Sequence, residues 1–214
     1  MTQWTQISKL RRNRMRFAVI VGTTIIISSV AGWVAYRRHH DYNHFAVHQD
    51  GRIYRSGWLA PSAMRDVIEG HQIRTVVNLC DPTEMSPDDW QQERKAVAKS
   101  GARVLEIPMP LTTRLNDDSI RRFVKILGSP EFYPILVHCR HGVTRTAKLL
   151  AIYDIAYRGM SANESLHAMP LFGRKNHNVH VRAFAREFEK RYRELYPDAR
   201  PSRLAVLRDA DETN

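Results

Sequence analysis

The chain has 214 residues, which leaves room for one domain with appendages and is too short for two full enzyme domains. Hydrophobic residues make up 43% and charged residues 26%, values typical of a globular protein, and two cysteines are too few for a disulfide scaffold or a four-cysteine zinc site. The net charge of +11 favours anionic partners, but about half of that excess falls within residues 1–44. The rest of the chain is only mildly basic, so we expect no nucleic-acid partner.

An uncharged, apolar run covers residues 17–36, after a basic N-terminal segment, residues 1–16. A helix of this length spans about 30 Å, the hydrocarbon thickness of a bilayer, so we predict one N-terminal transmembrane helix. Five basic residues precede the run and two follow it, which predicts a cytoplasmic N-terminus and an exported domain. A buried core helix, a signal peptide cleaved near residues 29–31 and the inverted topology are the alternatives.

Residues 37–44 are predicted to be a polar linker, residues 45–196 a folded domain and residues 197–214 a flexible tail. The first half of the domain contains patterns typical of a hairpin with a turn at Asp50-Gly51, followed by alternating helices and strands. The predicted strands are residues 45–47, 53–56, 75–79 and 103–107, and the predicted helices are residues 61–70 and 88–100.

The second half continues the alternation, with Asn116 as the expected cap of a helix over residues 117–127. Residues 135–137 are short and wholly apolar, which is typical of a central strand buried on both faces. Further helices are predicted over residues 146–158, after the capping box Ser161-x-x-Glu164, and over residues 181–196. The alternation indicates an α/β domain with a central, mainly parallel sheet flanked by helices.

The stretch ILVHCRHGVTRT, residues 135–146, carries the chemistry. A buried strand delivers Cys139 at its carboxyl end, and Arg145 follows in a loop that opens a helix, where backbone N–H groups and the helix dipole favour an oxyanion. Gly142 permits the required turn, and Arg145 can reach two phosphate oxygens with its planar fork. Thr146 can hydrogen-bond the sulfur and stabilise its thiolate form.

The spacing His138-Cys139-x5-Arg145-Thr146 resembles the signature of the protein tyrosine phosphatase superfamily, in particular its dual-specificity branch and a membrane-anchored member of the bacterial type. The resemblance covers roughly residues 45–195 and implies a cysteine-phosphatase fold, a cysteinyl-phosphate intermediate and no metal or other cofactor. In it Cys139 is the nucleophile, Arg145 holds the transferred phosphoryl group, and His138 orders the loop through hydrogen bonds. The implied phosphate-binding residues are Arg140, His141, Gly142, Val143, Thr144 and Arg145.

The general acid is where the chain departs from that family. An aspartate is expected near residues 111–113, and none stands there. Asp117 is our candidate acid, with stabilisation of the helix end as its alternative role, which we prefer for Asp118. Asp81 is the rival, because it follows a predicted strand that should end at the same sheet edge as Cys139.

Cys80 also follows a predicted strand, in an Asn-Leu-Cys sequence similar to that of the phosphoinositide 3-phosphatase branch, where such a cysteine can pair with the catalytic one. An inert, half-buried thiol is the alternative. Arg140, His141 and residues 174–177 are expected either to form the rim of the pocket or to be a solvated basic face. The histidines of the linker region are not expected to bind metal, because a flexible segment rarely preorganises a site.

The sequence therefore predicts a membrane-anchored, cysteine-dependent phosphatase acting on phosphorylated protein, lipid or inositol phosphate. A catalytically weak phosphate-binding module of the same fold is the alternative, since the expected acid is missing. A sulfur-transfer or arsenate-reducing enzyme also uses a loop cysteine, but His138 and the Arg145-Thr146 pair argue against it.

Overall fold

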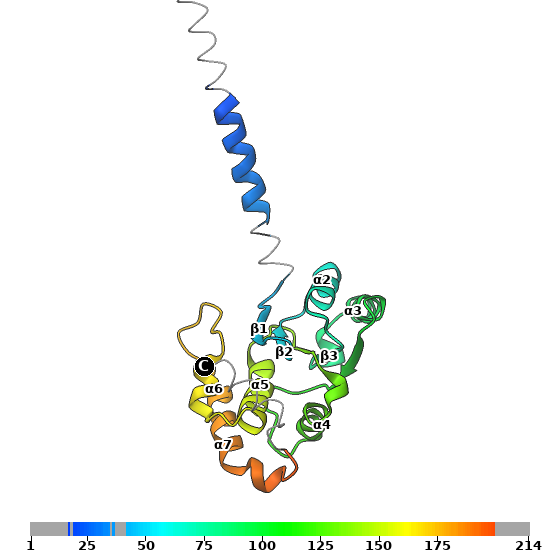
Figure 1. Cartoon of the computed structure of the whole chain (residues 1–214), viewed down its shortest axis with the longest axis vertical. Coiled ribbons are helices and arrows are strands. Elements are labelled where there is room, and N and C mark those ends of the chain that lie inside the picture. Colours follow the sequence, from blue (N-terminus) through cyan, green and yellow to red (C-terminus); the bar gives the residue numbers. More distant parts are fainter. Residues whose placement is uncertain (1–16, 18, 35, 37–41, 200–214) are drawn as a thin grey trace, which may run out of the picture. The chain divides into compact units, whose positions relative to one another are not determined.

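The computed structural model describes residues 17, 19–34, 36 and 42–199, in two compact units divided between residues 40 and 41 (Figure 1). Residues 19–34 are helical, with large apolar side chains such as Ile20 and Ile26 more than 60% exposed. Within the described ranges, no helix combines the length and the apolar character that crossing a membrane requires. Residues 18 and 35 of the predicted transmembrane span, like residues 1–16, 37–41 and 200–214, lie outside the described residues.

The second unit is built around a five-stranded sheet in the order β1-β2-β5-β3-β4. β1 pairs antiparallel with β2, and the other neighbours are parallel, so the predicted α/β class with a mainly parallel sheet is confirmed. β5 lies at the centre, as the apolar residues 135–137 predicted. The strands are β1 (Ala46–Gln49), β2 (Ile53–Ser56), β3 (Thr75–Asn78), β4 (Arg103–Glu106) and β5 (Ile135–His138).

Helices cover both faces of the sheet, because successive strand residues alternate between two cores. Leu136 faces the smaller core beneath α2 (Pro61–His71) and α3 (Pro87–Lys99), whereas Ile135 and Val137 face the larger one. The helices of the larger core are α4 (Asp118–Leu127), α5 (Thr144–Tyr157), α6 (Ala162–Ala168) and α7 (Val179–Leu195), and the 3-10 turns are η1 (Pro82–Glu84) and η2 (Pro130–Phe132).

The predicted boundaries of these helices and strands hold to within two residues, and two of the small differences have local reasons. The N-cap of α4 is Asp117, one residue later than the predicted Asn116. Helix α5 begins at Thr144, two residues earlier than predicted, because the turn at Gly142 already directs the chain into the helix. The predicted capping box of Ser161 and Glu164 opens α6, with both reciprocal hydrogen bonds formed.

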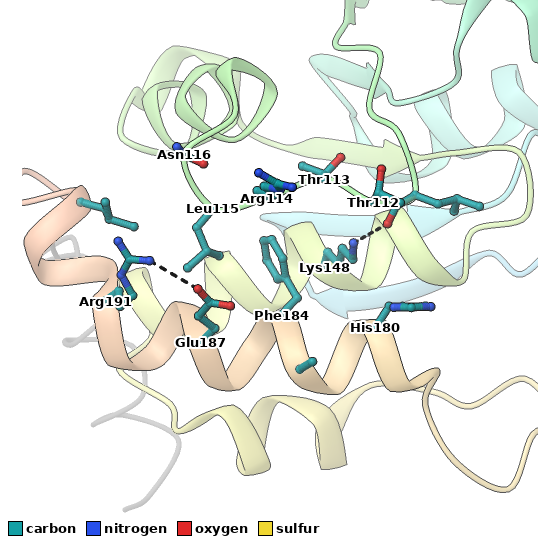
Figure 2. Close-up of a pocket in the computed structure, with 13 residues that line it drawn as sticks. Thr112, Thr113, Arg114, Leu115, Asn116, Lys148, His180, Phe184, Glu187 and Arg191 are labelled. Atoms are coloured by element: carbon teal, nitrogen blue, oxygen red, sulfur yellow. Dashed lines mark hydrogen bonds and ion pairs between the residues drawn. The ribbon is translucent and has the colours of Figure 1, made fainter.

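Segment 111–116 lies between β4 and α4 and faces α7, with Lys148 of α5 reaching its backbone (Figure 2). Helix α7 carries aromatic residues at a spacing of four, and the rings of Phe184, Phe188 and Tyr192 stack in succession along it. Helices α5 and α7 share the larger core, and Asn178 at the start of α7 lines the same cavity as the loop that follows β5.

Candidate active site

Cys139 is the first residue after the central strand, at the carboxyl edge of the parallel strands, and is only 2% exposed. Its Sγ atom accepts hydrogen bonds from the Gly142 backbone N–H and the Thr146 hydroxyl, each at 3.2 Å. The two donors fix the position of the sulfur at the start of the loop, where a nucleophile is required.

The loop after Cys139 is turned so that three successive carbonyl groups point away from the sulfur. The carbonyl oxygens of Arg140, His141 and Gly142 all contact side chains or backbone of residues 43–58. Their partners are Trp58 N (3.1 Å) and Asn43 Nδ2 (3.3 Å) on Arg140, His44 Nδ1 (2.7 Å) on His141, and Arg55 Nη2 (2.7 Å) on Gly142. Because peptide N–H and C=O groups point in opposite directions, this arrangement leaves the loop N–H groups to form an anion-binding concavity.

Asn43 and His44 belong to the segment that the sequence led us to treat as linker. In the structure, residues 42–44 are part of the same compact unit as the sheet. Their hydrogen bonds to the phosphate-binding loop make them part of the site, a role for which their polar composition carried no signal.

Gly142 is the conformational pivot of the loop, as predicted. Its φ of +67° is in the left-handed region, and a Cβ built on it would lie 2.4 Å from both the Ser56 carbonyl carbon and the Gly57 nitrogen. A side chain there would collide with backbone, so the loop can approach the end of β2 this closely only with glycine.

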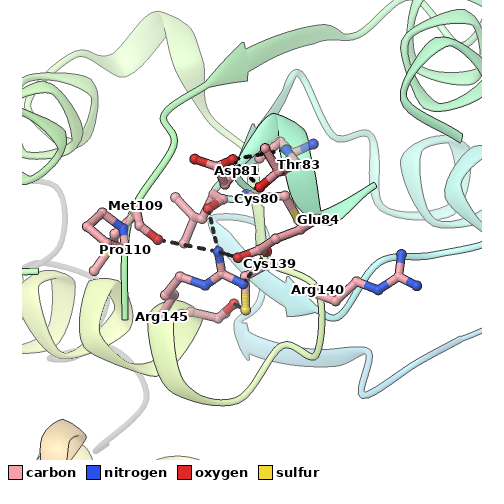
Figure 3. Close-up of polar contacts among 12 residues, drawn as sticks. Cys80, Asp81, Thr83, Glu84, Met109, Pro110, Cys139, Arg140 and Arg145 are labelled. Atoms are coloured by element: carbon pink, nitrogen blue, oxygen red, sulfur yellow. Dashed lines mark hydrogen bonds and ion pairs between the residues drawn. The ribbon is translucent and has the colours of Figure 1, made fainter. Parts of the chain in front are cut away.

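Arg145, in the first turn of α5, lies with its guanidinium beside Cys139 and is 4% exposed (Figure 3). Its Nη1 donates to the carbonyls of Leu79 (3.1 Å) and Met109 (3.3 Å), and Nη1 and Nη2 both bind Glu84, at 2.9 and 2.6 Å. Burial lowers the pKa of Arg145, but the hydrogen bond and charge of Glu84 outweigh it and raise the pKa overall. Within the described part of the chain Nε has no partner and Nη2 has only Glu84 Oε2, so the Nε–H and the second Nη2 N–H are the guanidinium donors left for phosphate oxygens.

Glu84 is a functional residue that the sequence reasoning missed. It ends η1, the turn that follows β3 and Asp81, and its bidentate ion pair fixes the plane of the Arg145 guanidinium. The available signal was a carboxylate shortly after a second strand predicted to end at the same sheet edge as Cys139.

Arg55 is another residue of the site that the sequence reasoning missed. It belongs to β2 and is 1% exposed, so it is a second buried arginine beside Arg145. Its guanidinium holds the Gly142 carbonyl and lies 5.0 Å from the centre of the Phe172 ring. Burial lowers its pKa to about 10, with the nearby Cys139 acting in the opposite direction. The signal that could have identified it was a charged residue inside a short predicted strand, residues 53–56.

A cavity of about 300 Å³ opens above Cys139. It is lined by the predicted His141, Val143, Thr144 and Arg145, and by Arg174 from the expected basic rim. Lys175 lies elsewhere, and the Arg140 guanidinium instead lies 5.9 Å from the centre of the Trp58 ring. Leu111, Asn176 and Asn178 complete the lining.

Neither aspartate considered as general acid lines this cavity. Asp117 accepts a hydrogen bond from the Arg114 N–H at 2.9 Å, through Oδ2, and caps the end of α4 without a side-chain bond to the helix. Asp81 accepts from the N–H and hydroxyl of Thr83, which lower its pKa, and it is exposed at the start of η1. Of the carboxylates near Cys139, only Glu84 contacts Arg145 among the residues described.

His138 is fully buried, but the hydrogen bonds to the loop that we expected from it are not formed. Its Nε2 lies 3.4 Å from Glu93 Oε1, and neither ring nitrogen makes a hydrogen bond within the described part of the chain. The reason is its position on the strand, which directs the ring toward α3, where Glu93 also accepts from Asn78.

Cys80 and Cys139 are both free and buried, at the ends of the adjacent parallel strands β3 and β5. The register pairs Asn78 with His138, so Cys80 is one position further along than the residue opposite Cys139. Burial raises the pKa of Cys80 to about 12, and the charge of Cys139 adds to this effect. Cys80 is therefore a protonated thiol at neutral pH, and its pairing with Cys139 stays a prediction.

A sulfur held by loop donors, a buried arginine with a free Nε and a strand–loop–helix frame define a cysteine-dependent phosphatase of the dual-specificity type. In agreement, residues 27–187 match the family described as "DSP-PTPase phosphatase fused to NAD+ Kinase", and the chain belongs to this family.

Individual proteins agree with this assignment. The chain is 26% identical over 106 residues to the inositol diphosphatase DSP4 of Arabidopsis thaliana, a match that spans 47% of this chain and half of that relative's length. The catalytic domain of the PP-IP phosphatase SIW14 from S. cerevisiae superposes with a TM-score of 0.57 at 19% identity, covering 70% of this chain and 90% of that one. Tk-PTP in its active form superposes with a TM-score of 0.51 at 23% sequence identity, covering 69% of this chain and 97% of that one. These two structures share the fold.

Proposed function

We propose that the chain hydrolyses phosphate monoesters in two steps through a phosphorylated Cys139. The observation that carries this proposal is the pair of donors on Cys139 Sγ together with the unpartnered Arg145 Nε beside it. In the first step the thiolate attacks phosphorus, a P–S bond forms and the P–O bond to the leaving group breaks. In the second step water attacks the same phosphorus, the P–S bond breaks, and inorganic phosphate and the thiolate are released.

Charge on the transferred phosphoryl oxygens is stabilised by groups that are already in place. The loop N–H groups face the cavity because the three carbonyls are held outward, and the ion pair with Glu84 fixes the direction in which Arg145 presents Nε. Preorganised donors of this kind lower the barrier without reorientation during the reaction.

Asp117 is our proposed acid for the leaving group, in the role that the family assigns to an aspartate before the helix that precedes the signature strand. Its carboxylate is bonded to the Arg114 N–H and stands outside the cavity in the described geometry. Acting as the acid therefore requires Asp117 itself to move toward Cys139 on substrate binding.

For the substrate we propose a phosphorylated inositol or a related small molecule or lipid headgroup. The matched relative is an inositol diphosphatase, and the cavity wall carries Arg174 and His141 beside Arg145. Several cationic or hydrogen-bonding groups around one phosphate site suit a ligand with more than one anionic group.

The full-length chain should be assayed against an aryl phosphate, inositol polyphosphates and phosphotyrosine peptides. We expect release of phosphate that disappears in Cys139→Ser and persists in Cys80→Ser, a matched control in which the neighbouring cysteine is changed. Turnover by the Cys139→Ser protein, or none by the parent, would exclude the mechanism; binding without turnover would support the phosphate-binding module.

We also propose that residues 17–36 anchor the protein in a membrane, with residues 1–16 on the cytoplasmic side and the phosphatase domain exported. The support is the uncharged sequence of residues 17–36, the exposed apolar side chains of residues 19–34 and the excess of basic residues before the run. Membrane fractionation with protease treatment of intact and lysed cells tests this. Recovery of the protein in the soluble fraction would contradict anchoring. A phosphatase domain that resists protease in intact cells and is digested only after the cytoplasm is opened would contradict export.

A further inference from the structure

A second cavity, of about 500 Å³, lies between segment 111–116 and helix α7 (Figure 2). Its lining includes Thr112, Thr113 and three residues with basic or imidazole side chains, Arg114, Lys148 and His180. The Thr113 hydroxyl already donates to the Pro110 carbonyl. Phosphatase chemistry at Cys139 does not use any of these residues, and all five line one cavity.

Lys148 is the most unusual of them, because its side chain is charged and only 2% of the residue is exposed. Its Nζ donates to the Leu111 carbonyl at 2.6 Å and lies 5.3 Å from the centre of the Phe184 ring. Burial lowers the pKa of Lys148, and the more distant Asp117 only partly opposes this. Neither direct contact carries a full negative charge, so an anion in the cavity would supply the compensation that a buried ammonium lacks.

The cavity is cationic as a whole. Among the described residues that line it, Glu187 is the single carboxylate, and Arg191 pairs with it at 3.4 Å. The charges of Arg114 and Lys148 are therefore not cancelled by the lining. The family's usual aspartate would stand near residues 111–113, and the Leu-Thr-Thr found there removes that source of repulsion.

This cavity and the catalytic one share one lining residue. Leu111 lines both, and the first turn of α7 separates them, with Asn178 on the catalytic side and His180 on the other. The Asn178 side chain accepts a hydrogen bond from the His180 N–H at 2.8 Å, which caps the helix. The positive end of a 17-residue helix thus lies between the two spaces.

We propose that this cavity is a subsite for a second phosphate group of a substrate whose first phosphate is bound at Cys139 and Arg145. Arg114, Lys148 and His180 supply the donors, and Thr112 is part of the same lining. The inference rests on the proposed phosphatase function and assigns it a substrate with at least two phosphates, held across Leu111.

The test compares two inhibitors of aryl phosphate hydrolysis by the full-length chain, inorganic phosphate and inositol hexakisphosphate. We expect Arg114→Gln and His180→Gln each to raise the inhibition constant of the hexakisphosphate about tenfold relative to that of inorganic phosphate, the value of one lost charge-assisted contact. Arg65→Gln, an exposed arginine of α2 outside both cavities, is the matched control and should leave that ratio unchanged.

Equal shifts for both inhibitors, or none, would overturn the subsite. If the parent protein hydrolyses no aryl phosphate, the proposed function fails, and the subsite is then judged separately by calorimetric titration of Cys139→Ser and its Arg114→Gln derivative with inositol hexakisphosphate. Identical affinities in that titration would reject it, and an approximately tenfold weakening would support it.

Discussion

The phosphate-binding loop, residues 139–145, and segment 109–117 face each other across the catalytic cavity and differ in how they are held. The loop is bound through its carbonyls to residues 43–58, and its sulfur already has two donors. Segment 109–117 is held by two cations of α5, since Arg145 reaches the Met109 carbonyl and Lys148 the Leu111 carbonyl, and it places no carboxylate in the cavity. The groups that would stabilise the phosphoryl oxygens are thus in place. A carboxylate that would protonate the leaving group is not among the described residues that line the cavity.

Arg145→Lys is the variant with the largest expected effect on this comparison. Lysine cannot keep the fork on Glu84 and also present a donor to the phosphate, so we expect turnover to fall by about 10²–10³-fold. The measurement is kcat/KM with an aryl phosphate and a phosphoinositol substrate. Near-normal turnover would show that the loop N–H groups alone are enough to stabilise the transferred phosphoryl group.

Asp117→Asn tests the leaving-group half. If Asp117 moves to serve as the acid, hydrolysis of poor leaving groups should fall by roughly 10²–10⁴-fold and that of aryl phosphates far less. Asp118→Asn, the neighbouring helix-end carboxylate, is the control. A small and equal change for both substrate types would mean that Asp117 serves only to accept the hydrogen bond from the Arg114 N–H. The same comparison should then be made with a variant of Asp81.

Glu84→Gln tests whether Glu84 matters because it orients the Arg145 guanidinium, since the variant leaves the charge of Arg145 itself unchanged. The amide can accept from only one arm of the guanidinium, so we expect a loss of about tenfold in kcat/KM, with the slope of the leaving-group dependence unchanged. An altered leaving-group dependence would instead implicate Glu84 in proton transfer.

Cys80→Ser has the smallest expected effect on initial rates and tests the reversibility of oxidation. Mild peroxide should inactivate the parent and dithiothreitol restore it, whereas the variant should stay inactive if Cys80 traps the oxidised Cys139. With its pKa raised to about 12, Cys80 attacks as a minor thiolate fraction, so trapping should accelerate as pH rises from 7 to 10. Equal recovery of both proteins would exclude the disulfide.

Sequence patterns predicted the sheet class, the central strand and the residues around Cys139, because these depend on local periodicity and on contacts within a few residues. Glu84, Arg55, Asn43 and His44 were missed because each reaches the loop or Arg145 from a segment distant in sequence. The expected ring contacts of His138 failed for a related reason, since Glu93 comes from a helix whose packing the pattern of strands did not specify.

The hydrogen bonds from Asn43 and His44 have a practical consequence for where the catalytic domain can be cut. A fragment that starts at residue 45, the boundary suggested by hydropathy and polarity, leaves the His141 carbonyl without its partner and the Arg140 carbonyl with one partner instead of two. Its loop amides should exchange with deuterium faster than those of a fragment that starts at residue 42, although the sheet amides should exchange alike. The start of the autonomous unit is therefore set by the hydrogen bonding of the loop, nearly 100 residues downstream.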